Sequence, residues 1–93
     1  MFEWSPEKNR RLIRERGVSF EAIVSRIEAG AILAIVPGRG MYAHQKLFLI
    51  ELDRYVYVVP FGVGGGRVFL KTIIPSRKMT RNFLREADHE TGA

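Results

Sequence analysis

A chain of 93 residues is long enough for one hydrophobic core but too short for separate catalytic and binding domains, so we expect a single domain over residues 1–93. The absence of cysteine excludes disulfides and thiolate metal sites as supports for the fold. The formal net charge of +5 favours an acidic partner, with nucleic acid first and an anionic membrane surface or an acidic protein after it.

The apolar segments are too short for export or for membrane insertion. The first residues include an acid, Glu3, and no apolar core of signal-peptide length. No later apolar run approaches the length that a membrane-spanning helix needs. We therefore expect a soluble protein that works in the cytoplasm and has no membrane partner.

The first part of the chain predicts a short strand and a helix. Residues 2–4 alternate apolar, acidic and apolar, as in a brief strand. Ser5 followed by Pro6 is typical of a helix start, because serine caps free amides and proline lacks an amide that the first turn does not use. This helix should cover residues 6–16. Its basic face is either simply solvated or in contact with nucleic acid, and the sequence leaves both open.

A second helix and three strands should follow. Ser19 caps a helix whose apolar residues recur at core-facing spacing until Gly30. Apolar and β-branched runs then predict strands over residues 31–36, 47–52 and 55–61.

Two hairpins should join the later strands. Asp53 and Arg54 form a two-residue turn, and the glycine-rich run 62–67 closes the second hairpin. The next strand breaks at Pro75, a short helix follows, and residues 87–93 should form a frayed tail. The expected fold is α+β, with a mostly antiparallel sheet of about four or five strands, two N-terminal helices on one face and a short C-terminal helix.

The hairpins also predict which residues share a face of the sheet. If the whole glycine-rich run is a loop, Phe61 pairs with Arg67, and Tyr57 therefore pairs with Lys71. The face under the two helices is then aliphatic: Leu47, Leu49, Val56, Val58, Val68, Leu70 and Ile74. The opposite face mixes cations with apolar and aromatic residues: Lys46, Phe48, Ile50, Tyr57, Arg67, Phe69 and Lys71. That mixture suits base stacking and phosphate binding, although the aromatic residues could instead form a second small core beneath the C-terminal helix.

Few groups in the chain are suited to catalysis. The acids show no metal-ligand spacing, two histidines cannot build a His-rich metal site, and neither G-x-S-x-G nor a dinucleotide fingerprint is present. We expect no metal and no cofactor. Cleavage of RNA by its own 2′-hydroxyl fits this inventory, because the protein need only orient that group, neutralise the phosphate and move protons.

The cations concentrate between residues 67 and 85, where no acid interrupts them. The candidates for catalysis are Lys71, Arg77 and Lys78, with Tyr57 or His44 for proton transfer. The candidates for RNA binding are Lys46, Tyr42, Arg67 and Arg81. A lysine crowded by other cations can have its pKa lowered enough to act as a base. The alternative is a basic module that binds RNA or an acidic partner without cleaving anything.

Two stretches resemble a known family. The opening FEWSPEKNRRLIRERGVSFEAI and the later IIPSRKMTRNFL are similar to motifs of the BrnT family of bacterial toxins, which belongs to the RelE-like ribonuclease toxins. The matching positions in the first stretch are Phe2, Trp4, Pro6, Lys8, Gly17, Val18, Ser19, Phe20 and Glu21. Those in the second are Ile73, Ile74, Ser76 or its neighbour, Arg77, Lys78 and Thr80.

The resemblance implies a particular biology. It implies a RelE-like fold, an endoribonuclease activity in the cytoplasm and neutralisation by a cognate antitoxin in a hetero-oligomer. By position it points to Arg77 and Lys78, and then to Lys46 and Lys71, as functional residues.

Overall fold

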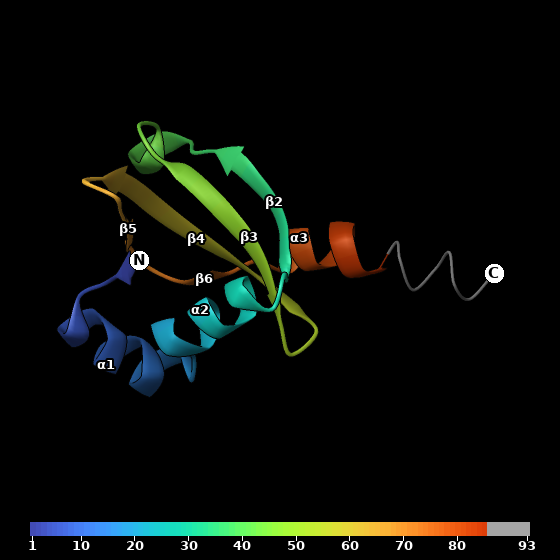
Figure 1. The fold of residues 1–93 in the computed structure, drawn as a ribbon. Helices are drawn as coiled ribbons and strands as arrows, with labels where there is room; N and C mark the ends of the chain where they lie inside the picture. Colours follow the sequence, from blue (N-terminus) through green and yellow to red (C-terminus); the bar gives the residue numbers. More distant parts are fainter. Residues whose placement is uncertain (86–93) are drawn as a thin grey trace.

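The structure is a computed structural model that describes residues 1–85, and it has the expected α+β architecture (Figure 1). Its strands form one mostly antiparallel sheet in the order β1-β5-β4-β3-β2, with β6 also paired to β4. In chain order the elements are β1 (Phe2–Glu3), α1 (Pro6–Arg16), α2 (Phe20–Glu28), β2 (Ile32–Pro37), the 3-10 turn η1 (Gly40–Tyr42), β3 (Lys46–Leu52), β4 (Tyr55–Gly64), β5 (Arg67–Leu70), β6 (Ile74–Pro75), α3 (Arg77–Thr80) and the π-helical turn η2 (Arg81–Arg85). The expected tail, residues 87–93, lies outside the described residues.

Helices α1 and α2 start at the serine caps that the sequence predicts. The hydroxyls of Ser5 and Ser19 each accept a hydrogen bond from a backbone N–H three residues further on. Asn9 then joins the two helices, because its side chain accepts from the N–H of Phe20 at 2.8 Å and donates to Glu21 Oε1 at 2.7 Å. None of the helices within residues 1–85 is long and apolar enough to span a membrane.

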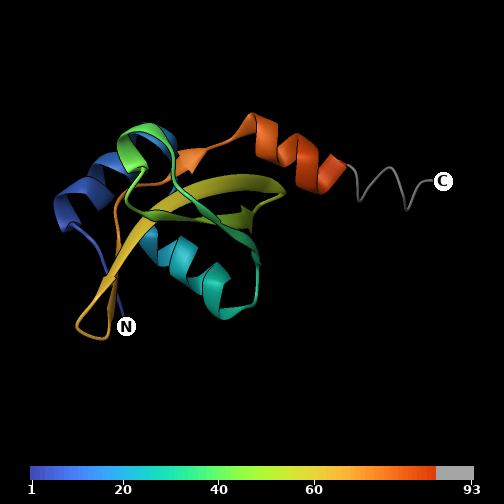
Figure 2. The same cartoon turned by 90° about the horizontal axis from the view of Figure 1, so that it is seen from above.

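Both helices cover the same face of the sheet, as predicted (Figure 1). Together they enclose one core, and Trp4 stacks on Phe20 at its edge with 5.6 Å between ring centroids. The buried side chains of this core are Leu12, Val18, Phe20, Ile23, Phe48, Ile50, Val59, Phe61, Leu70 and Ile73. Seen from above, α3 and α2 lie on opposite sides of the sheet (Figure 2).

The predicted register of the second hairpin was wrong. Strand β4 continues to Gly64, and the turn consists only of Gly65 and Gly66, whose φ angles are 59° and 74°. Phe61 therefore pairs with Leu70 and not with Arg67. The difference is an odd number of residues, so it moves every side chain of β5 to the other face relative to β4.

The predicted neighbours of Tyr57 change with this register. Tyr57 pairs with Pro75 of β6, so Lys71 does not lie opposite it. The aromatic residues do not build a second core under the C-terminal helix either. Phe48 is buried in the main core and Tyr57 packs against that core, whereas Phe69 is 38% exposed.

The face under the helices was also assigned wrongly for β3 and β4. The alternation of side chains places Phe48, Ile50 and Tyr57 in the core beneath the helices. The predicted aliphatic members of these strands lie on the opposite face: Leu47, Leu49, Val56 and Val58. Both faces of these strands are apolar and buried, as Leu49 and Val56 on the opposite face show, so alternation alone does not indicate which face lies under the helices. Only Val68 and Leu70 of β5 lie under the helices as predicted.

Candidate functional site

Hydrogen bonds hold the start of α3 to the first residues of β4. Ser76 caps the helix by accepting from the N–H of Met79 at 3.1 Å. Thr80 Oγ1 donates to the carbonyl of Ser76 at 2.7 Å and accepts from the N–H of Val56 at 2.8 Å. The N–H of Ser76 completes the link by donating to the carbonyl of Val56 at 3.0 Å. Because a helix this short has little stability alone, these bonds hold it in place.

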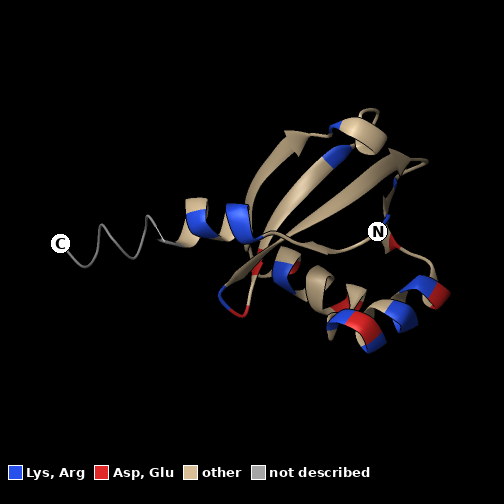
Figure 3. Cartoon of the chain, turned by 180° about the vertical axis from the view of Figure 1, so that it is seen from behind, with Lys and Arg blue, Asp and Glu red and all other residues tan. Residues whose placement is uncertain are grey.

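The cations of α3 and of the first residue of η2 are exposed and form no ion pair with a carboxylate within residues 1–85. Arg77, Lys78 and Arg81 are exposed. The ion pairs formed within residues 1–85 involve two other arginines, Arg26 and Arg67. Figure 3 shows basic bands on α3 and no acidic band on that helix. Uncompensated positive charge at this end of the sheet is suited to hold a phosphate backbone.

Two tyrosines lie near the start of β4. Tyr57 pairs with Pro75, two residues before Arg77, so it lies on the strand next to the start of α3. Its ring lies 5.6 Å from that of Tyr55, and both side chains are partly buried. Tyr57 packs against the core beneath α1 and α2, so its backbone, and not its side chain, lies next to the start of α3.

Lys71 lies further along the sheet. Its N–H donates to the carbonyl of Pro60 at 2.8 Å, and Pro60 is four residues from Val56 along β4. That spacing corresponds to roughly 13 Å. The ammonium of Lys71 stands 4.9 Å from the centroid of the Phe69 ring, an arrangement typical of a cation–π contact.

The remaining predicted site residues lie in two other places. Arg67 is in an ion pair, and Lys46, His44 and Tyr42 lie at the far end of the sheet. Arg67 pairs with Glu3 at 3.2 Å, so its charge is already compensated. Lys46 pairs with Phe61 at the end of the sheet away from α3. Its distance from the level of Val56, five residues along β4, is roughly 17 Å. His44 and Tyr42 precede Lys46 in the connection from β2 to β3.

The structure thus gathers only part of the predicted site. Arg77, Lys78 and Arg81 follow β6 and lie near the backbone of Tyr57, whereas Lys71 and Lys46 lie elsewhere. Tyr55 and Thr80 were not among the predicted site residues. The alternation of Tyr55 with Tyr57 was a usable signal, because residues two apart on a strand share a face. Nothing in the sequence signals the bond from Thr80 to β4.

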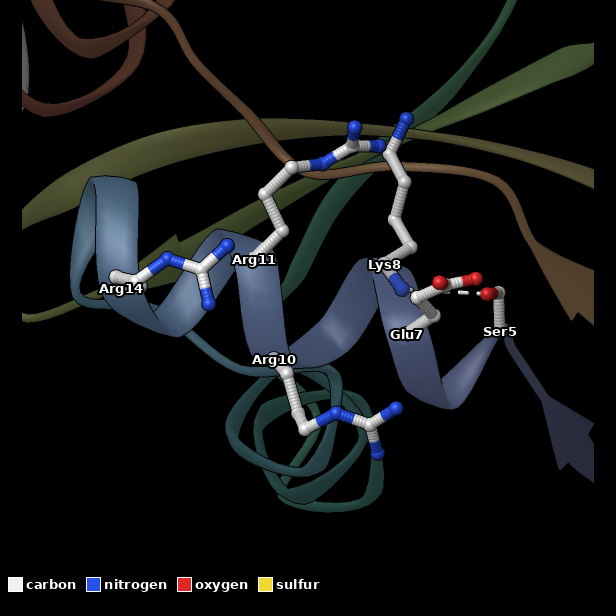
Figure 4. Close-up of a pocket in the computed structure, with 6 residues that line it drawn as sticks. All are labelled: Ser5, Glu7, Lys8, Arg10, Arg11 and Arg14. Carbon is white, nitrogen blue, oxygen red and sulfur yellow. Dashed lines mark hydrogen bonds between the residues drawn. The ribbon is translucent and has the colours of Figure 1, made fainter.

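Helix α1 carries a second basic surface. Side chains of α1 and its cap border a hollow of about 640 Å³: Ser5, Glu7, Lys8, Arg10, Arg11 and Arg14. Figure 4 shows the basic side chains spreading outward from one helix. Because every lining residue comes from the same helix or its cap, the space lies between long side chains and is not a cleft between elements.

The described part of the chain contains no cluster of metal ligands. No group of three or more His, Asp or Glu side chains within residues 1–85 is placed to hold a metal ion. No protein-family model matches this sequence, and no curated protein matches it significantly.

Proposed function

We propose that the chain is the toxin of a bacterial toxin–antitoxin pair and acts as an endoribonuclease in the cytoplasm. The observation that carries this proposal is the exposed cationic turn that begins with α3, which forms no ion pair with a carboxylate within residues 1–85. The motifs that resemble the BrnT family include Arg77 and Lys78 of this turn. A cognate antitoxin would form a hetero-oligomer with the chain.

The proposed reaction uses the substrate's own nucleophile. The 2′-oxygen attacks the adjacent phosphorus, and the bond from phosphorus to the 5′-oxygen breaks. The products are a 2′,3′-cyclic phosphate and a 5′-hydroxyl. The protein removes the proton of the 2′-hydroxyl and supplies one to the leaving 5′-oxygen, while positive charge stabilises the phosphorane-like transition state.

The roles follow from position. Arg77, Lys78 and Arg81 hold and polarise the phosphate, because they are exposed and close together on one turn. Tyr57, at the same end of β4, is the proposed proton-transfer group, and its hydroxyl must turn from the core face toward the phosphate to act. Lys71 and Lys46 bind flanking phosphates, since they lie too far along the sheet to reach the same one.

An assay of RNA cleavage in EDTA tests the proposal. Arg77→Ala should lower the cleavage rate about a hundredfold, the usual effect of removing one group that stabilises a transition-state charge. Arg10→Ala is the matched control, because it removes an exposed arginine from α1 and should leave the rate unchanged. Intact RNA after incubation with folded wild-type protein would refute the proposal, as would undiminished cleavage by Arg77→Ala.

A second candidate is a basic module that binds RNA or an acidic protein without cleavage. It is favoured by the separation of the predicted residues, because Lys71 and Lys46 do not converge with Arg77 on one phosphate. A gel shift run beside the cleavage assay distinguishes the two functions. Salt-sensitive binding without products would support the binding module.

A further inference from the structure

The end of the sheet away from α3 has an open apolar groove. Its floor is the stacked pair Phe48 and Phe61, with 3.9 Å between ring centroids, and its volume is about 450 Å³. Ile35 and Val63 border it and are 54% and 72% exposed. In Figure 1 this end, where η1 joins β2 to β3, stands away from the two helices. The groove is therefore a continuation of the core face that the helices do not cover.

Strand β2 adds an open edge beside this groove. The strand order ends with β2, so within the described sheet one row of its backbone groups has no partner strand. The stretch from Ala31 to Gly38 contains no charged residue. Edge strands are usually protected by lysines, prolines or bulges. Here a bulge lies near Ile32 and Pro37 ends the strand, so its middle is left free to accept another strand.

The rim of the groove is basic. Lys46 and His44 line it, and no acid is among the lining residues of this hollow or of the adjoining one of about 640 Å³. The exposed Arg39 follows β2 at the same end. Gln45 lines both hollows, and its Oε1 is buried without a hydrogen-bond partner among the described residues.

From these features we infer that the groove and the edge of β2 together bind an extended segment of another protein. The segment adds a strand to β2, places apolar side chains over Phe48 and Phe61, and sets acidic side chains against Lys46. This inference goes beyond the proposed function and does not depend on it, because the surface lies at the opposite end of β4 from α3.

Two other occupants fit less well. A second copy of the chain would bring a basic rim toward an identical rim, and like charges that face each other repel. RNA would need open aromatic faces on which to stack. Phe48 and Phe61 are each only 6% exposed and are stacked on one another, so neither offers such a face.

The test is a selection of random displayed peptides of about ten residues, the upper end of ordinary strand length, on the immobilised full chain. The selected peptides should alternate apolar residues and carry Asp or Glu. Their affinity should fall about tenfold or more for Ile35→Asp, because a charge would enter the apolar contact. Ile13→Asp is the matched control, because Ile13 is 48% exposed on α1, away from the groove. This variant should bind the peptides normally.

A charge reversal guards against misfolding as an explanation. Lys46 is exposed, so Lys46→Glu should fold normally, weaken the acidic peptides and restore binding when their acids are changed to lysine. The inference would be overturned by a lack of enriched peptides, or by peptides that bind Ile35→Asp as well as wild type. A dimer in sedimentation that Ile35→Asp dissociates would contradict it too. RNA cleavage should be unchanged in Ile35→Asp, so failure of the proposed function would leave this result intact.

Discussion

Asn9 is a buried polar residue that connects the two N-terminal helices. It is 7% exposed, and its amide both accepts from the N–H of Phe20 and donates to Glu21. Asparagine suits this position because one side chain carries both an acceptor and a donor. The bond fixes the start of α2, from which Phe20 enters the core.

Replacement of Asn9 by alanine should therefore destabilise the fold. Asn9→Ala leaves the N–H of Phe20 buried without a partner, and we expect the free energy of unfolding to fall by about 1–3 kcal/mol. Denaturant titration measures this quantity. Asn82→Ala is the control, because Asn82 is exposed on η2 and should change stability by less than about 0.5 kcal/mol. An unchanged unfolding midpoint for Asn9→Ala would show that the bond does not contribute.

At the level of the elements, the two hairpin turns differ in how well their residues suit the backbone. The turn between β4 and β5 uses two glycines. The turn between β3 and β4 uses Asp53 and Arg54, whose φ angles are 53° and 63°. A left-handed backbone conformation is unfavourable for any residue that has a β-carbon, whereas glycine adopts it without this penalty. Glu51 Oε2 offsets part of this cost by accepting from the N–H of Arg54 at 2.9 Å.

Glycine at the second turn position should stabilise the chain. Arg54→Gly removes the strain and keeps the backbone N–H that bonds Glu51. We therefore expect the free energy of unfolding, measured by thermal denaturation, to rise by about 0.5–1 kcal/mol. Arg39→Gly is the control, because Arg39 is also exposed but has a φ of −136°, at which glycine brings no advantage. If both glycine variants shift the melting temperature upward equally, backbone strain is not the cause.

The elements that the sequence predicted are those with local signals. The caps at Ser5 and Ser19 and the turn at Asp53 depend on neighbouring residues alone. The extent of β4 does not, since glycines between Phe61 and Arg67 fit a loop or a strand equally well. Because of that ambiguity, the predicted pairing of Lys71 with Tyr57 was wrong. The sequence thus predicted the cations of α3 but not their separation from Lys71 and Lys46, which depends on register.

The whole molecule carries its positive charge in separate places. Basic side chains of α1 surround one hollow, and those of α3 stand at the end of β4. Figure 3 shows acidic bands among the basic ones on α1 but not on α3. If α3 contacts the phosphates, position should matter more than net charge.

Matched neutralisations separate these two effects. Changing Arg77, Lys78 and Arg81 to glutamine should make the salt dependence of single-stranded RNA binding shallower by a slope of about 2, since each phosphate contact contributes about 0.7. Changing Arg10, Arg11 and Arg14 to glutamine removes the same charge and should leave the slope unchanged. An equal loss of slope in both variants would mean that net charge, and not α3, determines binding.

The chemistry of the RNA ends is the most direct test of the proposed cleavage. Wild-type protein in EDTA should produce a 2′,3′-cyclic phosphate and a 5′-hydroxyl, and an RNA with deoxyribose at the cleaved position should remain intact, because the 2′-oxygen is the nucleophile. Products with 3′-hydroxyl and 5′-phosphate ends, or cleavage at the deoxyribose, would contradict this account.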